Sequence, residues 1–136
     1  MDNFKLSHFF QICAVVYGLV GIGLLAIPTE FLSPFAVGLN AGGVWITRIA
    51  GAALIGFAVT FWLGRNAGPS PLRRGLLAGN LSYHVLDLLT NGAALASSVL
   101  NAFGAIFVIL HLLLGLGFGY FLLFGSEADS PRVGAR

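Results

Sequence analysis

The chain has 136 residues, of which 57% are hydrophobic and only 9% are charged, and its net charge is +2. Soluble domains devote about a quarter of their residues to charge, so a mean hydropathy of +0.92 excludes an ordinary soluble fold. Seven basic residues against five acidic ones form no basic tract, and we expect no nucleic-acid partner. The single cysteine, Cys13, excludes a disulfide framework and a thiolate metal cluster.

Four apolar segments are long enough to cross a hydrocarbon core of about 30 Å. They predict an all-α, polytopic membrane protein in which a bundle of four transmembrane helices forms a single domain, 1–125, followed by a polar cytoplasmic tail, 126–136. The four predicted spans cover approximately residues 7–27, 44–64, 73–97 and 103–124.

The first span carries small residues, Gly18 and Gly21, within one helical sector. Small side chains allow helix backbones to approach closely in a membrane, so we expect this sector to pack against another helix. The connection that follows, from Pro28 to Gly43, is broken by prolines and glycines but remains apolar. We expect it to lie along the outer interface or to fold back over the bundle as a lid.

The second span begins near Trp45, and Trp62 lies at its other end, as in the aromatic belts of membrane helices. Arg48 lies about one turn inside the outer boundary, with Ala52 and Gly56 following at four-residue intervals. These three residues share one helical face. We therefore predict that Ala52 and Gly56 pack against a neighbouring helix and that Arg48 either reaches the outer headgroups or pairs with an acid.

The placement of basic residues predicts the orientation of the chain. Lys5 precedes the first span, arginines between 65 and 74 lie between the second and third, and Arg132 and Arg136 follow the fourth, whereas the other two connections contain no Lys or Arg. By the positive-inside rule both termini are cytoplasmic. We expect a multi-pass protein of the bacterial inner membrane.

The third span contains the most informative pattern. Asn80, His84, Asp87 and Asn91 are spaced four, three and four residues apart, which places them on one narrow helical face. In the fourth span His111 shares a face with Gly115 and Gly119, the predicted helix-packing residues there. We predict an intramembrane polar network in which Arg48 pairs with Asp87, with the other members being Asn80, His84, Asn91 and His111.

This network has two readings. It can fix helix register through intramembrane hydrogen bonds of roughly 0.6–2 kcal/mol each, or it can mark a proton relay, ion path or ligand site. Either histidine could ligate the metal of a pigment or haem, and a quinone could bind, although no cofactor is predicted. No metal site is predicted from the spacing, and no nucleophile elbow, zinc motif or aspartate dyad occurs, so we expect no enzyme.

Several short stretches resemble a group of small, uncharacterised bacterial membrane proteins with four helices. They are Leu-Leu-Ala-Ile-Pro at 24–28, Val-Gly-Leu-Asn at 37–40, Thr-Arg-Ile-Ala-Gly-Ala-Ala-Leu-Ile-Gly at 47–56, a short arginine-containing loop and a glycine-rich last helix. The resemblance implies an all-helical bundle in the inner membrane and no particular activity.

The leading interpretation of the sequence is a non-enzymatic accessory or assembly subunit. It would pack against a larger membrane complex, with energy-transducing, respiratory and photosynthetic complexes as the candidates, and its partners would be lipid and either other membrane proteins or copies of itself. The first alternative is a small transporter, channel or proton-coupled binding protein that uses the Arg, Asp and His cluster. The second is binding of a pigment, haem or quinone.

Overall fold

The computed structural model describes residues 5–125, and all regular elements in that range are helices. The four long helices differ from the predicted segments by at most three residues, at the start of α3, which begins at 41 rather than 44. The predicted tail, 126–136, lies outside the described residues. The elements are α1 (Leu6–Ala26), α2 (Pro28–Leu32), η1 (Ser33–Phe35), α3 (Ala41–Gly64), α4 (Pro71–Ala96), η2 (Ala102–Gly104) and α5 (Ala105–Phe124).

Local sequence explains where the helices begin. The Asn40 side chain accepts a hydrogen bond of 2.8 Å from the Gly43 amide and caps α3. Ser70 caps α4 in the same way through the Arg73 amide, and Pro71 follows at the first helical position, where its missing N–H costs nothing. Pro28 ends α1 and starts α2, so the chain turns there and then continues through η1.

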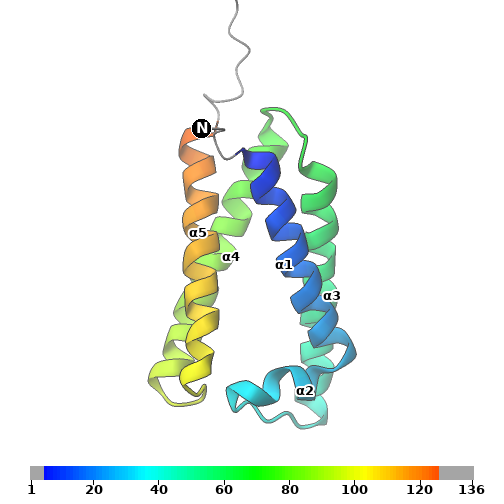
Figure 1. Cartoon of the computed structure of the whole chain (residues 1–136), viewed down its shortest axis with the longest axis vertical. Coiled ribbons are helices and arrows are strands. Elements are labelled where there is room, and N and C mark those ends of the chain that lie inside the picture. Colours follow the sequence, from blue (N-terminus) through cyan, green and yellow to red (C-terminus); the bar gives the residue numbers. More distant parts are fainter. Residues whose placement is uncertain (1–4, 126–136) are drawn as a thin grey trace, which may run out of the picture.

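The long helices form two hairpins. α1 packs mainly on α3, and α4 packs mainly on α5. In Figure 1 the hairpins lie close together at the upper end, where the described chain begins and ends, and they spread apart toward the lower end, which α2 crosses. The α3–α4 connection is also at the upper end.

The α1–α3 hairpin is held by a close crossing of two glycines. A Cβ added to Gly51 would lie 2.7 Å from both the Gly21 carbonyl oxygen and the Leu25 amide nitrogen, and one added to Gly21 would lie 2.8 Å from the Gly51 carbonyl oxygen. Two helix backbones can approach this closely only where both have glycine at the point of crossing. The crossing therefore depends on glycine at both positions.

The two hairpins meet through large side chains in the upper half of the molecule. Phe10, Phe61 and Phe118 are fully buried, and the Phe61 ring lies 5.1 Å from that of Phe10 and 5.4 Å from that of Phe118 between ring centroids. Phe9 joins this cluster at 4.9 Å from Phe118. Because these rings come from α1, α3 and α5, they close the upper half of the space between the hairpins.

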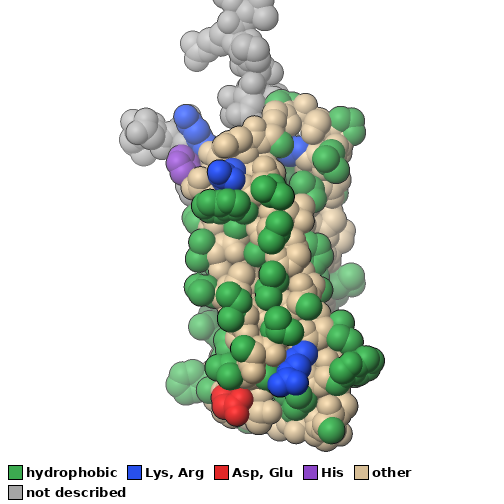
Figure 2. All heavy atoms as spheres, turned by 90° about the vertical axis from the view of Figure 1, so that its right-hand side faces the viewer, with side chains coloured by type: hydrophobic (Ala, Val, Ile, Leu, Met, Phe, Trp, Pro, Cys, Tyr) green, Lys and Arg blue, Asp and Glu red, His purple; other side chains and the backbone are tan. Residues whose placement is uncertain are grey.

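Three helical segments are long and apolar enough to cross a membrane: α1, α3 and the stretch from Ala102 to Phe124. α4 has sufficient length, but it contains the polar stripe and two arginines. In Figure 2 basic side chains gather near the upper end of the face shown, a basic and an acidic group lie near the lower end, and the band between them carries no charged side chain. This pattern is typical of a membrane protein.

Candidate functional site

The inward face of α4 carries polar side chains into the interior of the molecule. Arg73, Asn80 and His84 are buried, and His84 is only 1% exposed. Asp87 and Asn91 continue the same stripe and are half-buried. Within residues 5–125 every buried side-chain nitrogen or oxygen has a hydrogen-bonding partner. The buried polar groups of the stripe therefore belong to a network in which each has a hydrogen-bonding partner.

A chain of close contacts links α4 to α1 and α5. The Tyr17 hydroxyl donates to Asn80 Oδ1 at 3.2 Å and also lies 2.8 Å from His84 Nε2. His84 Nδ1 lies 2.9 Å from His111 Nδ1, and His111 Nε2 lies 3.5 Å from Asp87 Oδ2. In the order of their contacts, the linked groups are Asp87, His111, His84, Tyr17 and Asn80, and together they form a hydrogen-bonded chain.

The donors in this chain can all point in one of two directions, because a neutral imidazole has one donor and one acceptor nitrogen. With Asp87 ionised, His111 Nε2–H faces the carboxylate, His84 Nδ1–H donates to His111, and the Tyr17 hydroxyl donates to His84. With Asp87 protonated, its hydroxyl donates to His111 Nε2, each later donor reverses, and Tyr17 donates to Asn80. Asn80 thus supplies the acceptor that the reversed chain needs.

A cavity of about 460 Å³ lies between the two hairpins, below the aromatic cluster. Its walls are contributed by all four long helices and by α2, including Phe31, and most of its lining is aliphatic or aromatic. Such a mostly apolar cavity with a few convergent polar groups is the usual form of a small-molecule site. The polar groups on its wall include Tyr17, Tyr83, Asp87 and His111.

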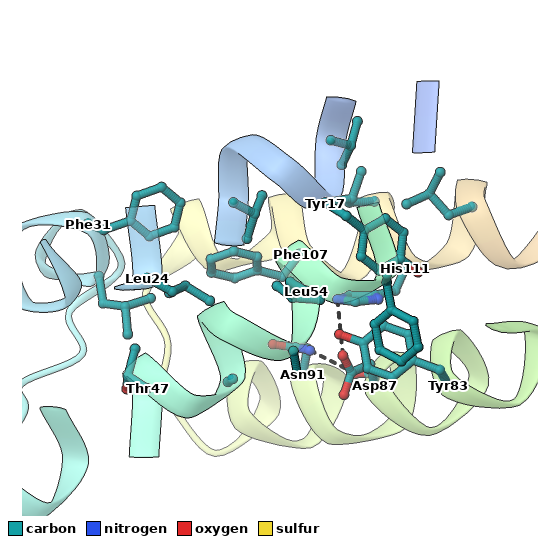
Figure 3. Close-up of a pocket in the computed structure, with 18 of the residues that line it drawn as sticks. Tyr17, Leu24, Phe31, Thr47, Leu54, Tyr83, Asp87, Asn91, Phe107 and His111 are labelled. Carbon is teal, nitrogen blue, oxygen red and sulfur yellow. Dashed lines mark hydrogen bonds and ion pairs between the residues drawn. The ribbon is translucent and has the colours of Figure 1, made fainter. Parts of the chain in front are cut away.

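The cavity has a polar end and an apolar end. In Figure 3 Tyr83, Asp87, Asn91 and His111 lie together at one end, while Leu24 and Phe31 lie at the other, toward α2. Side-chain contacts hold the polar end in place, since the Tyr83 ring lies 5.2 Å from that of His84 and 5.8 Å from that of His111. An elongated ligand would therefore meet most of the hydrogen-bonding groups at one of its ends, with Thr47 as the polar side chain labelled toward the other in Figure 3.

The structure brings together Asn80, His84, Asp87 and His111, but it leaves Arg48 outside this cluster. Arg48 is exposed on α3, and within residues 5–125 the ion-pair partner of Asp87 is His111. The reason is that α3 packs on α1, which leaves the Arg48 face outward. Asn91 contributes little to the chain, because its amide donates to the Asp87 backbone carbonyl at 2.9 Å.

Of the residues predicted to pack between helices, some face a neighbouring helix and others are exposed. Gly18 faces Ala58 across the α1–α3 contact, whereas Gly115 and Gly119 face His84 and Leu81 across the α4–α5 contact. Ala52 and Gly56 are exposed, and a Cβ added to Gly56 would meet nothing within 4 Å. The α3 face that contacts α1 carries Gly51 and Ala58, about 100° around the helix from the predicted face.

Neither histidine presents a free ring nitrogen to the cavity. Both nitrogens of His84 face Tyr17 and His111, and both nitrogens of His111 face His84 and Asp87. Ligation of haem or of a pigment metal would require breaking one of these contacts. Over the described part of the chain, no three His, Cys, Asp or Glu side chains are grouped so that they could hold a metal ion.

Sequence reasoning did not identify the tyrosines of the site. Tyr17 is 3% exposed and joins α1 to α4, yet the small-residue pattern of α1 emphasises a different sector. The available signal was the spacing of Leu6, Phe10, Cys13 and Tyr17, which alternates between four and three residues and marks the buried seam. Tyr83 immediately precedes His84 in the sequence, and no spacing pattern marks it as a residue of the site.

Comparisons of the chain with protein-family models, with curated proteins and with solved structures find no match. The resemblance to small four-helix membrane proteins therefore stays a prediction.

Proposed function

We propose that this chain is a four-span protein of the bacterial inner membrane that binds a lipid-soluble small molecule in the cavity between its hairpins. The supporting observation is the cavity itself, which lies among helices of membrane-spanning length and has hydrogen-bonding groups at one end. Binding requires no nucleophile or metal, so the proposed role is non-enzymatic.

The four-span topology is supported by contacts between the two lower connections. The Asn101 amide group donates to the Pro34 carbonyl at 2.8 Å, and the Asn101 backbone N–H donates to the Phe35 carbonyl at 3.2 Å. The Phe35 and Phe107 rings lie 4.5 Å apart. Since the α4–α5 connection lies beside the segment between α1 and α3, α4 runs the length of the molecule as the other long helices do.

The surface of α4 suits a lipid environment despite its polar stripe. Its outward side chains include Leu86 and Leu89, which are 63% and 65% exposed. The exposed hydroxyls of Ser82 and Thr90 donate to the carbonyls four residues earlier, at 3.0 and 2.9 Å. These hydroxyls thus have partners within the helix, as a lipid-facing surface requires. Cytoplasmic termini follow from the basic residues near the α3–α4 connection.

Photolabelling with benzophenone, a neutral lipophilic probe, tests the cavity. We expect saturable labelling of peptides that line it, and we expect Ala53→Trp, which places a large ring on the cavity wall, to remove that labelling. Ala52→Trp is the matched control, because Ala52 is exposed on the same helix and does not line the cavity. Unsaturable labelling spread over the outward helix faces would contradict the proposal.

An accessory-subunit role is a second candidate. It is favoured by the exposed small residues Ala52 and Gly56, which leave room for another helix to approach α3. Purification in mild detergent tests it: a stable protein partner that is lost in Gly56→Leu would support the role. A chain that runs alone or only with copies of itself would exclude it.

A further inference from the structure

We propose that the ligand of the cavity is a lipophilic organic cation, such as an amine or quaternary ammonium compound, and that it pairs with the Asp87 carboxylate. This inference rests on the proposed binding function and assigns the chemical class of the ligand. The observation that supports it is that Asp87 lies on the wall of an apolar cavity and has no permanently charged partner among residues 5–125.

The charge of Asp87 is balanced only in part by its surroundings. Its side chain is 32% exposed, and its ion-pair partner, His111, is cationic only when protonated. Other ionisable groups that face this end of the cavity are Tyr17 from α1 and Tyr83 from α4, with His84 behind them. The residues that α3 and α2 contribute to the cavity wall carry no ionisable side chain. A carboxylate in this setting favours an added positive charge.

Aromatic rings complete the environment that an organic cation prefers. Tyr17, Tyr83 and Phe57 surround the polar end, and the Tyr83 and Phe57 ring centroids lie 6.1 Å apart. Cations are attracted to the faces of such rings, and the attraction grows when water is excluded. The remaining aliphatic and aromatic wall, extending to Phe31, can hold the apolar part of the same molecule.

The chain of hydrogen bonds behind Asp87 can stay in place when the cation binds. A carboxylate has two oxygens that accept hydrogen bonds, so Asp87 can face His111 Nε2–H and pair with the cation at the same time. Behind His111, His84 and the Tyr17 hydroxyl continue the chain, with Tyr17 2.8 Å from His84 Nε2.

The test compares 4-phenylbutyl-trimethylammonium with its neutral analogue, in which a tert-butyl group replaces the trimethylammonium group. Each competes with benzophenone photolabelling of the purified protein. We expect the cation to compete at a concentration at least about tenfold lower than its neutral analogue does. Asp87→Asn should abolish this preference while retaining benzophenone labelling. Asp87→Glu should keep the preference. Glu30→Gln, which removes an exposed acid outside the cavity lining, is the matched control.

Equal competition by the cation and its neutral analogue would overturn the assignment but leave the cavity function standing. Loss of saturable benzophenone labelling in the wild type would instead overturn both.

Discussion

Of the side chains in the hydrogen-bonded chain from Asp87 to Asn80, Tyr17 is the one on which the others depend most. Its hydroxyl serves both Asn80 Oδ1 and His84 Nε2, and His84 is 1% exposed, so water cannot easily replace it. Tyr17→Phe keeps the ring and its packing but leaves two buried groups without that partner. We expect the free energy of unfolding to fall by roughly 1–3 kcal/mol, measured by thermal unfolding in detergent.

Tyr120→Phe provides the control at this scale. Tyr120 is 58% exposed on α5, so removal of its hydroxyl should leave the unfolding temperature unchanged. Equal destabilisation by the two substitutions would mean that the Tyr17 hydroxyl stabilises nothing beyond what an exposed hydroxyl does. The Tyr17 prediction concerns stability alone and holds whatever the cavity binds.

At the scale of the helices, the α1–α3 crossing is the most constrained contact. Gly51→Leu would place a Cβ 2.7 Å from the Gly21 carbonyl oxygen and the Leu25 amide nitrogen. Since backbone atoms cannot turn aside as a flexible side chain can, the two helices must separate. We expect a loss of stability of about 1–3 kcal/mol or more, seen as a lower unfolding temperature in detergent.

Gly56→Leu makes the same chemical change five residues later on the same helix. Nothing lies within 4 Å of the added Cβ, so the same measurement should give little change or a small gain, because leucine favours helix more than glycine does. If Gly51→Leu were tolerated as well as Gly56→Leu, the close crossing would not be a determinant of the hairpin.

The helices and the inward stripe of α4 could be predicted from the sequence, because apolar length sets helix bounds and the spacing of Asn80, His84 and Asp87 sets one face. The partners of that stripe could not. Which side of a uniformly apolar helix meets its neighbour depends on close packing of the backbones. A rotation of about 100° separates the Gly51 face from the one expected, and it leaves Arg48 outside the site.

At the scale of the whole molecule, the arrangement depends on whether α4 crosses the membrane. α4 is long enough, but it is not among the three segments that are apolar enough by composition alone. Composition treats every residue as though it faced lipid, whereas Asn80 and His84 face the interior and are buried. The hydrogen bond from Asn101 to the Pro34 carbonyl joins the α4–α5 connection to the α1–α3 connection at the lower end of the molecule. A crossing α4 is therefore consistent with both connections lying on the same side of the membrane.

Labelling of introduced cysteines with a membrane-impermeant maleimide tests this topology. The native Cys13 is fully buried and should not react. Gly38→Cys and Val99→Cys lie at exposed positions of the two lower connections and should be labelled on intact cells, whereas Gly68→Cys, in the α3–α4 connection, should react only after permeabilisation. If Val99→Cys behaved like Gly68→Cys, α4 would not cross the membrane. Labelling of Val99→Cys together with Gly38→Cys, with Gly68→Cys reacting only after permeabilisation, would show that both α3 and α4 cross the membrane, because two sites on the same side of a membrane are separated by an even number of crossings.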